Sequence, residues 1–205
     1  NGRRRLGGTL DGVLAEYVCL PEHAVVKQPH HLTDVEAATL PIAGVTAWQA
    51  LFAQGRLRPG DTLVVQGTGG VSIFAFQLAH LAGAPVIVTS STDEKLERAR
   101  GMGASGTINS RRQPDWHVEV IKLTDGRGAD HVIDVVGGQN LSRSVAATKV
   151  GGTVSLVGYL GGTRGELDLP LAFRRVVTLQ AISVGSRASF EALVAACETS
   201  GMHPV

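Results

Sequence analysis

The chain has 205 residues, of which 43% are hydrophobic and 18% charged, and its formal net charge is +1. This length suffices for one large domain, or for one domain and part of another. The near-neutral charge, with no basic stripe interleaved with aromatic residues, is not the pattern of a nucleic-acid-binding protein, so we expect no nucleic-acid partner.

Cysteine usage and the apolar runs indicate the compartment. Cys19 and Cys197 are the only cysteines and form no C-x-x-C motif, so neither a disulfide framework nor a cysteine zinc cluster is indicated. No apolar run reaches the ~18 residues that a membrane-spanning helix needs, and the N-terminus lacks the residue order of a signal peptide. We expect a cytoplasmic protein without a membrane partner.

The first 60 residues carry a mixed pattern. Residues 12–29 have the composition of a strand interrupted by prolines, and residues 32–41 and 43–55 have the pattern of two helices. We expect a domain boundary here and divide the chain into residues 1–35 and 36–205.

From residue 61 onward, short apolar runs alternate with amphipathic segments. Strands are predicted at 62–66, 84–90, 105–109, 129–137, 153–159 and 176–184, and helices at 70–83, 92–103, 114–126, 139–152 and 188–201. Strands rich in Val and Ile that alternate with helices indicate a parallel sheet covered on both faces. Six strands is the number in a doubly wound dinucleotide-binding sheet. The predicted fold is therefore α/β, a doubly wound parallel six-stranded (Rossmann) sheet.

Two glycine clusters compete for the phosphate-binding role. Gly101, Gly103 and Gly106 form a complete G-x-G-x-x-G, but a lone match is weak. A phosphate-binding motif needs a strand before it and a helix after it, and here the order is reversed. We interpret Gly101 or Gly103 as the C-cap of the preceding helix.

The segment 67–72, Gly-Thr-Gly-Gly-Val-Ser, has the correct order, because a strand precedes it and a helix follows. Gly67 would make the tight turn, and Gly69 with Gly70 would let backbone N–H groups approach a pyrophosphate. Ser72 replaces the third glycine and is small enough for helix–strand packing. A plain glycine-rich turn, or the site of a methyl donor, remains the alternative.

The end of the second strand bears on the choice between NAD and NADP. An NAD site usually places a carboxylate there, whereas this strand ends in Ser90 and Ser91 and the first carboxylate is Asp93. The two hydroxyls and Lys95 would hold a 2′-phosphate by charge-assisted hydrogen bonds. We therefore expect NADP(H), with NAD(H) as the alternative.

Two further observations qualify this cofactor prediction. Arg111 and Arg112 follow the third strand and could add positive charge. In the alternative interpretation, Ser91 only caps the next helix, in a capping box with Glu94.

Three stretches, LPIAGVTAWQAL, residues 60–104 and VGSRASFEAL, resemble the medium-chain dehydrogenase/reductase superfamily, in particular its zinc-type alcohol dehydrogenase-like and quinone oxidoreductase-like members. The resemblance covers nearly the whole chain and implies an oxidoreductase that moves hydride to or from a carbonyl, enone or quinone of a small-molecule substrate. It implies that residues 1–35 are the remnant of a GroES-like catalytic β domain, so the chain looks truncated and could be inactive alone. A homodimer through the last strand is also implied.

The resemblance also implies cofactor-binding residues. Many NADP-using relatives have a tyrosine just after the third strand, where this chain has Ser110. This difference weakens the NADP assignment unless Arg111 substitutes for the tyrosine. The implied contacts are Thr46 beside the nicotinamide; Gly67, Thr68, Gly69, Gly70 and Val71 at the pyrophosphate; Ser90, Ser91, Lys95 and Arg111 at the 2′-phosphate; Val135, Val136 and Gly137 over the adenosine; and Val157, Gly158, Tyr159, Ser183, Val184 and Gly185 at the nicotinamide carboxamide. No catalytic acid or base is identified.

The resemblance implies that members with a catalytic zinc place a third ligand near residues 38–47, which contain no Cys, His, Asp or Glu here. We therefore expect the zinc-independent branch and no metal site. Adjacent His30 and His31 are interpreted as part of a surface turn, and His80 and His131 as structural histidines.

Asp134, at the end of a strand, could act in function or hold the backbone. Two other functions stay open: a non-catalytic nucleotide-binding module, and another nucleotide-fold enzyme such as a methyltransferase.

Overall fold

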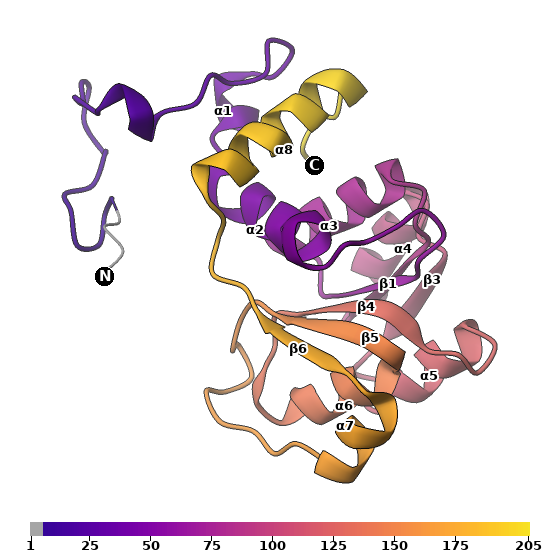
Figure 1. Ribbon diagram of the computed structural model, residues 1–205. Helices are drawn as coiled ribbons and strands as arrows, with labels where there is room; N and C mark the ends of the chain where they lie inside the picture. The colour runs from indigo at the N-terminus through magenta and orange to yellow at the C-terminus, as the bar shows by residue number, and fades with distance from the viewer. Residues whose placement is uncertain (1–5) are drawn as a thin grey trace.

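The computed structural model describes residues 6–205, which form a single six-stranded sheet flanked by helices (Figure 1). All neighbouring strands are parallel, in the order β3-β2-β1-β4-β5-β6, which confirms the predicted doubly wound topology. The strands are β1 (Leu63–Gln66), β2 (Val86–Ser90), β3 (Gly106–Asn109), β4 (Ala129–Asp134), β5 (Thr148–Leu156) and β6 (Thr178–Ala181). The strand order reverses between β1 and β4, which places a crevice at the carboxyl ends of these two strands.

The helices lie in two layers. Contacts and shared cores place α2 (Val45–Trp48), α3 (Gly70–Leu81), α4 (Asp93–Gly101) and α8 (Arg187–Ser200) on one face, and α5 (Trp116–Leu123), α6 (Leu141–Ala147) and α7 (Leu169–Arg175) on the other (Figure 1). Leu63 and Val65 of β1 belong to the first core, and Val64 between them to the second. This alternation follows from the pleat, since successive side chains of a strand point to opposite faces.

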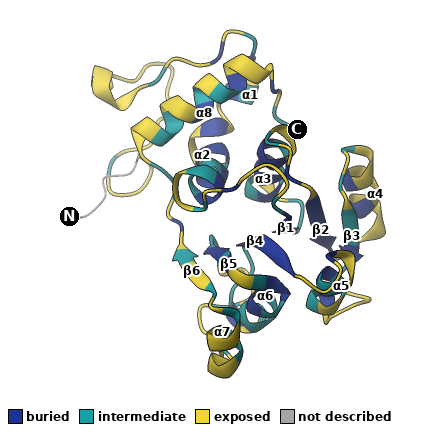
Figure 2. Ribbon diagram, turned by 45° about the vertical axis from the view of Figure 1, so that its right-hand side comes forward, coloured by how far each residue is buried: buried dark blue, intermediate teal, exposed yellow. Residues whose placement is uncertain are grey.

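Strands β1, β2 and β4 are buried along their whole length, as the dark blue of the sheet centre shows in Figure 2. A strand covered on both faces cannot alternate apolar with polar residues, which explains its near-continuous Val and Ile runs. Edge strand β6 is mostly exposed.

The predicted pair of helices in residues 32–55 is more continuous than expected. A capping box of Thr33 and Glu36 opens α1 (Asp34–Ala37). Two π-helical turns, Leu40–Gly44 and Gln49–Gln54, then flank α2. Together with α2 they form one continuous helical rod over residues 40–54. The Cβ of a larger residue at Gly44 would lie 3.1 Å from Leu193 Cδ2, so the rod packs closely on α8.

Several local predictions were wrong. Residues 12–29 form no strand: only a short 3-10 turn (Glu22–Ala24) lies there, and side chains such as Leu14 and Tyr17 are exposed. A segment with the composition of a strand forms one only where a neighbouring strand accepts and donates its backbone hydrogen bonds. The helix predicted at 139–152 ends at Ala147, and the remainder begins β5.

Helix α7 was missed, although its start carries a local signal. The Asp168 carboxylate accepts a hydrogen bond from the Leu171 N–H at 2.9 Å, and Pro170 occupies the first turn. Both residue types are favoured at these positions.

The expected Ser91–Glu94 capping box is also absent. The N-cap of α4 is Thr92, whose side chain makes no capping bond. Within residues 6–205, no helix combines the length and apolar composition needed to cross a membrane.

Candidate functional site

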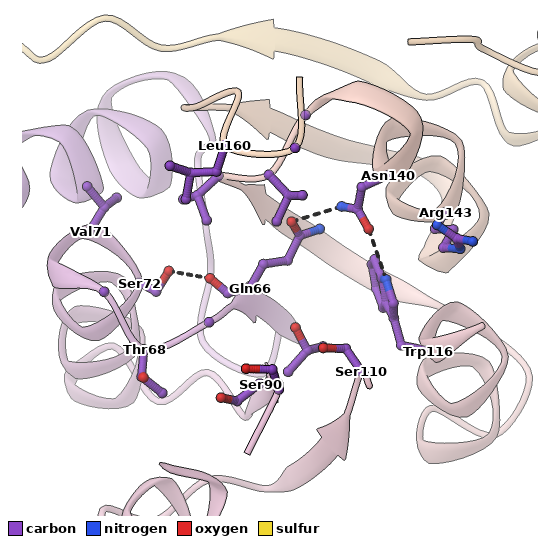
Figure 3. A pocket seen from close by; sticks show the side chains of 18 of the residues that line it. Gln66, Thr68, Val71, Ser72, Ser90, Ser110, Trp116, Asn140, Arg143 and Leu160 are labelled. Carbon is purple, nitrogen blue, oxygen red and sulfur yellow. Dashed lines mark hydrogen bonds between the residues drawn. The ribbon is translucent and has the colours of Figure 1, made fainter. Parts of the chain in front are cut away.

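A cleft of about 690 Å³ opens at the carboxyl ends of β1, β2 and β4, at the crevice that the strand order creates. Figure 3 shows it between the β1–α3 turn, the start of α5 and the segment after β4. The cleft brings together these predicted residues: Gly67, Thr68, Gly69, Gly70, Val71, Ser90, Ser91, Lys95, Val135, Val136 and Gly137.

The β1–α3 turn presents bare backbone to the cleft. Gly67 has φ +73°, which glycine adopts without strain, and its N–H donates to Thr89 O at 2.7 Å. Ser72 Oγ donates to Gln66 O at 2.7 Å and so ties the first turn of α3 to the end of β1 (Figure 3). Gly69 is the N-cap of α3, and a Cβ built there would meet no atom within 4 Å.

The N-terminus of α3 is therefore open to the cleft, with no side chain covering it at Gly69. The first amide groups of a helix have no intrahelical acceptor, and the helix dipole adds partial positive charge there. No acidic side chain lies in the first turn. This arrangement fits a diphosphate.

The complete G-x-G-x-x-G lies elsewhere. Gly103 has φ +95° just after α4, and a Cβ there would lie 3.3 Å from His80 Cε1. The C-cap of α4 is Met102, not Gly101 or Gly103 as interpreted from the sequence, and Gly103 is the residue after the cap, where glycine with a positive φ ends a helix. None of the three glycines lines the cleft.

The end of β2 presents hydroxyl groups and one lysine. Ser90 is buried, whereas Ser91 and Lys95 are exposed, and all three line the cleft. The Asp93 carboxylate accepts from Asn109 Nδ2 at 2.6 Å and pairs with Arg112 Nη2 at 2.6 Å. Among the ion pairs of residues 6–205, none involves Lys95.

The segment after β4 is held by Asp134, which is fully buried. Its Oδ1 accepts from Val136 N at 2.9 Å and Gly137 N at 2.8 Å. The chain after β5 docks on this segment, since Gly161 N donates to Val136 O at 2.7 Å. A Cβ at Gly158 would lie 2.6 Å from Val135 O, so the two backbones approach too closely for a side chain. Of the alternatives for Asp134, the structure supports the backbone-holding one.

The remaining predicted residues lie outside the lining of the cleft: Thr46, Arg111, Val157, Gly158, Tyr159, Ser183, Val184 and Gly185. Two of these segments meet each other, because a Cβ at Gly185 would lie 2.6 Å from Val45 Cγ2, beside Thr46. Val184 has φ +58°, which is rare for a β-branched residue and is typical of functional segments.

Sequence reasoning missed part of the cleft floor. Gln66, Trp116, Asn140, Arg143, Leu160 and Gly161 line it. Gln66 had a usable signal, because a polar residue that ends a buried apolar strand next to a glycine turn needs a partner. Trp116 and Asn140 had no such signal in the sequence, because they come from separate segments that only the fold brings together.

Among the described histidines, His131 alone is buried, and its contacts are structural. His131 Nε2 lies 2.8 Å from Ser155 Oγ, and burial lowers the pKa of His131 to about 4. His31 Nε2 lies 3.0 Å from Met202 O, whereas His80 is exposed. Within residues 6–205, no three His, Cys, Asp or Glu side chains converge as metal ligands.

The profile of the zinc-binding dehydrogenase family matches residues 70–199. A zinc-type alcohol dehydrogenase-like protein of Schizosaccharomyces pombe is 44% identical over 206 residues, covering 98% of this chain and 60% of that protein. The crystal structure of a candidate alcohol dehydrogenase from Sinorhizobium meliloti 1021 is 46% identical and matches with a TM-score of 0.94, over 98% of this chain and 59% of that one.

A structure named as an NAD-dependent alcohol dehydrogenase matches with a TM-score of 0.91 at 36% identity, over 98% of this chain and 59% of that one. The chain thus spans about three fifths of the length of these relatives. The profile match takes in more than half of the chain, and the sheet order is that of a dinucleotide-binding domain. The chain therefore belongs to the zinc-binding dehydrogenase family, in agreement with its resemblance to the medium-chain dehydrogenase/reductase superfamily.

Proposed function

We propose that the chain is the NADP(H)-binding part of an oxidoreductase that transfers hydride to or from a carbonyl, enone or quinone without a catalytic zinc. One observation carries the proposal. Gly67 and Gly69 leave the N-terminus of α3 open to the cleft, where amide groups and the helix dipole suit a diphosphate.

The choice of NADP(H) rests on charge at the end of β2. The hydroxyls of Ser90 and Ser91 and the ammonium of Lys95 suit a 2′-phosphate. The nearest carboxylate, Asp93, is already bound by Asn109 and Arg112, which weakens its repulsion of an anion. A relative at 36% identity is named as NAD-dependent, so NADH is the necessary comparison.

When bound, the nicotinamide cofactor supplies the hydride. The residues of this chain bind and orient it: the 67–71 turn takes the diphosphate, and the Asp134-held segment covers the adenosine. We assign the nicotinamide end to Thr46 and the neighbouring segment 183–185. Thr46 is buried, and its Oγ1 donates to Ile42 O at 2.5 Å, so its position is fixed. We assign no acid or base.

Calorimetric titration of the chain with NADPH, NADH and S-adenosylmethionine tests the ligand class. We expect NADPH to bind more tightly than NADH. Binding of S-adenosylmethionine without NADPH would overturn the proposal in favour of a methyltransferase.

A matched pair of glycine variants locates the site. Gly69 has φ −79° and open space around it, so Gly69→Ala should leave the fold intact while its methyl group obstructs the diphosphate. We expect NADPH affinity to fall about tenfold or more, the cost of overpacking a contact. Gly101→Ala, in the complete but misplaced motif, also meets no atom within 4 Å and should leave affinity unchanged.

Turnover decides between an enzyme and a binding module. NADPH oxidation with aldehydes, enones and quinones should be measured for this chain and for a longer form of the protein. Binding by both forms with turnover by neither would favour a non-catalytic module.

A further inference from the structure

Five side chains under the cleft form one chain of hydrogen bonds, of which the proposed function uses only Asp134. Trp116 Nε1 donates to Asn140 Oδ1 at 3.1 Å, and Asn140 Nδ2 to Gln66 Oε1 at 3.0 Å (Figure 3). Gln66 Nε2 then donates to Ser144 Oγ at 2.7 Å, and Ser144 Oγ to Asp134 Oδ2 at 2.7 Å. This hydrogen-bond chain thus joins α5 and α6 to the ends of β1 and β4.

The donor-to-acceptor direction of this hydrogen-bond chain is fixed by Trp116 at one end and Asp134 at the other. An indole N–H can only donate, and a carboxylate can only accept. Asn140 must therefore turn its oxygen to Trp116 and its amino group to Gln66. Gln66 must in turn point its amino group at Ser144, whose hydroxyl hydrogen is then directed at Asp134. Each amide has one orientation that satisfies all its neighbours.

The hydrogen-bond chain also borders the cleft. Trp116, Gln66 and Asn140 line the cleft, and the second oxygen of Asp134 holds the segment 135–137, which lines it too. Trp116, Gln66 and Asp134 are respectively 3%, 2% and 0% exposed. A broken link therefore leaves a buried polar atom without a partner, which is costly.

We propose that Asn140 and Gln66 are positioning residues, which hold Trp116 and the segment 135–137 at the separation that the adenosine half of a dinucleotide requires. This inference rests on the proposed function. The adenosine half is indicated because Trp116 and the segment 135–137 line the same cleft as Ser90, Ser91 and Lys95, to which the proposed function assigns the 2′-phosphate of the adenosine ribose. The segments assigned to the nicotinamide, Thr46 and 183–185, lie outside its lining.

Exchanges between Asn and Asp, which have the same shape, test the direction of the hydrogen-bond chain. Asn140→Asp still accepts from Trp116 but cannot donate to Gln66. The Gln66 amide must then flip, which draws the Ser144 hydrogen away from Asp134. Asp134→Asn also disturbs the hydrogen-bond chain. The new amide donates to Ser144 Oγ, which already accepts from Gln66, so the Ser144 hydroxyl hydrogen loses the carboxylate and can turn only to the Asn140 backbone oxygen, 3.4 Å away.

The double variant Asn140→Asp/Asp134→Asn should restore every hydrogen bond among the five side chains, with the donors and acceptors between positions 134 and 140 exchanged. The amide introduced at position 134 donates to Ser144, Ser144 to the flipped Gln66, and Gln66 to the new carboxylate at 140. The net charge is unchanged, and the oxygen that accepts from Val136 and Gly137 is kept.

The probe is adenosine 2′,5′-bisphosphate, titrated calorimetrically well below the unfolding temperature, with nicotinamide mononucleotide as the comparison. We expect each single variant to bind the bisphosphate about tenfold more weakly, as for one unsatisfied buried group. The double variant should return to within about twofold of the wild type. Binding of the mononucleotide should not change. Additive losses in the double variant would overturn the proposal.

The indole signals give a readout that is independent of ligand. The chain has two tryptophans, so a ¹H–¹⁵N spectrum of Trp48→Phe identifies the Trp116 signal. Asn140→Asp should keep a hydrogen-bonded Trp116 indole, whereas Asn140→Leu should shift it and speed its exchange.

If Asp134→Asn does not fold, the two Asn140 variants decide. Wild-type affinity for the bisphosphate in both would overturn the proposal while leaving the proposed function standing. A wild-type chain that binds neither NADP⁺ nor NAD⁺ would overturn the proposed function and the positioning role together.

Discussion

Arg112 Nη2 lies 2.6 Å from Asp93 Oδ2, so the loop after β3 neutralises the first carboxylate of α4. Asn109 supports the pair, because its Nδ2 donates to Asp93 Oδ1 while its Oδ1 accepts from the Arg111 and Arg112 N–H groups at 3.1 and 3.2 Å. Asp93 lies two residues from both Ser91 and Lys95, which line the cleft. Its charge therefore bears on any anion that these residues bind.

Arg112→Ala should weaken NADPH binding about threefold and NADH binding much less. Removal of the guanidinium exposes the Asp93 charge to a 2′-phosphate, and exposed ion pairs contribute only about 0.2–1 kcal/mol. Fluorescence titrations at low salt measure both affinities. Asp93→Asn in the Arg112→Ala background should restore NADPH binding. An equal loss for both cofactors would contradict this account.

Acid should destabilise the fold through His131. Burial lowers its pKa from 6.5 to about 4, so the folded state binds fewer protons than the unfolded chain between these values. Stability is therefore retained above pH 6.5 and is lost as the pH falls toward 4, by up to about 3 kcal/mol.

Urea unfolding of the wild type and of His131→Gln across this pH range measures the effect. The variant lacks the titrating ring, so the difference between the two free energies should change with pH. A constant difference would mean that the buried ring does not titrate as stated.

The two glycines of the turn should separate stability from binding. Gly67→Ala places a Cβ at φ +73° in open space, so its cost is conformational and about 1 kcal/mol. Gly69→Ala, at φ −79°, should change the unfolding free energy by less than Gly67→Ala does, because the entropy that alanine removes from the unfolded chain offsets its poorer fit at the N-cap. Thermal unfolding measures both variants without ligand. A Gly69→Ala variant less stable than Gly67→Ala would contradict the geometry.

We propose that β6 pairs with its copy in a homodimer. It is one of the two edge strands of the sheet, and Leu179 and the neighbouring Val176 and Phe173 are exposed. An unpaired apolar edge strand favours association. Sedimentation equilibrium should show a dimer for the wild type and a monomer for Leu179→Lys. Val118→Lys, at an exposed position on α5, is the matched control and should remain dimeric.

Local patterns predicted the elements that are buried on both faces. Strands β1, β2 and β4 were located because complete burial requires continuous apolar runs. Helix α7 was missed, and residues 12–29 were misread, because exposed segments carry weaker periodicity and strand composition does not supply a bonding partner.

The sequence by itself determined the sheet topology and the choice of glycine turn, because both depend on the order of neighbouring elements along the chain. Only the tertiary structure decided what surrounds that turn. Trp116, Asn140 and Gln66 come from three separate elements, and Asp93 is neutralised by a residue beyond the next strand. Such contacts form when the sheet brings distant segments together, so no local period or spacing records them.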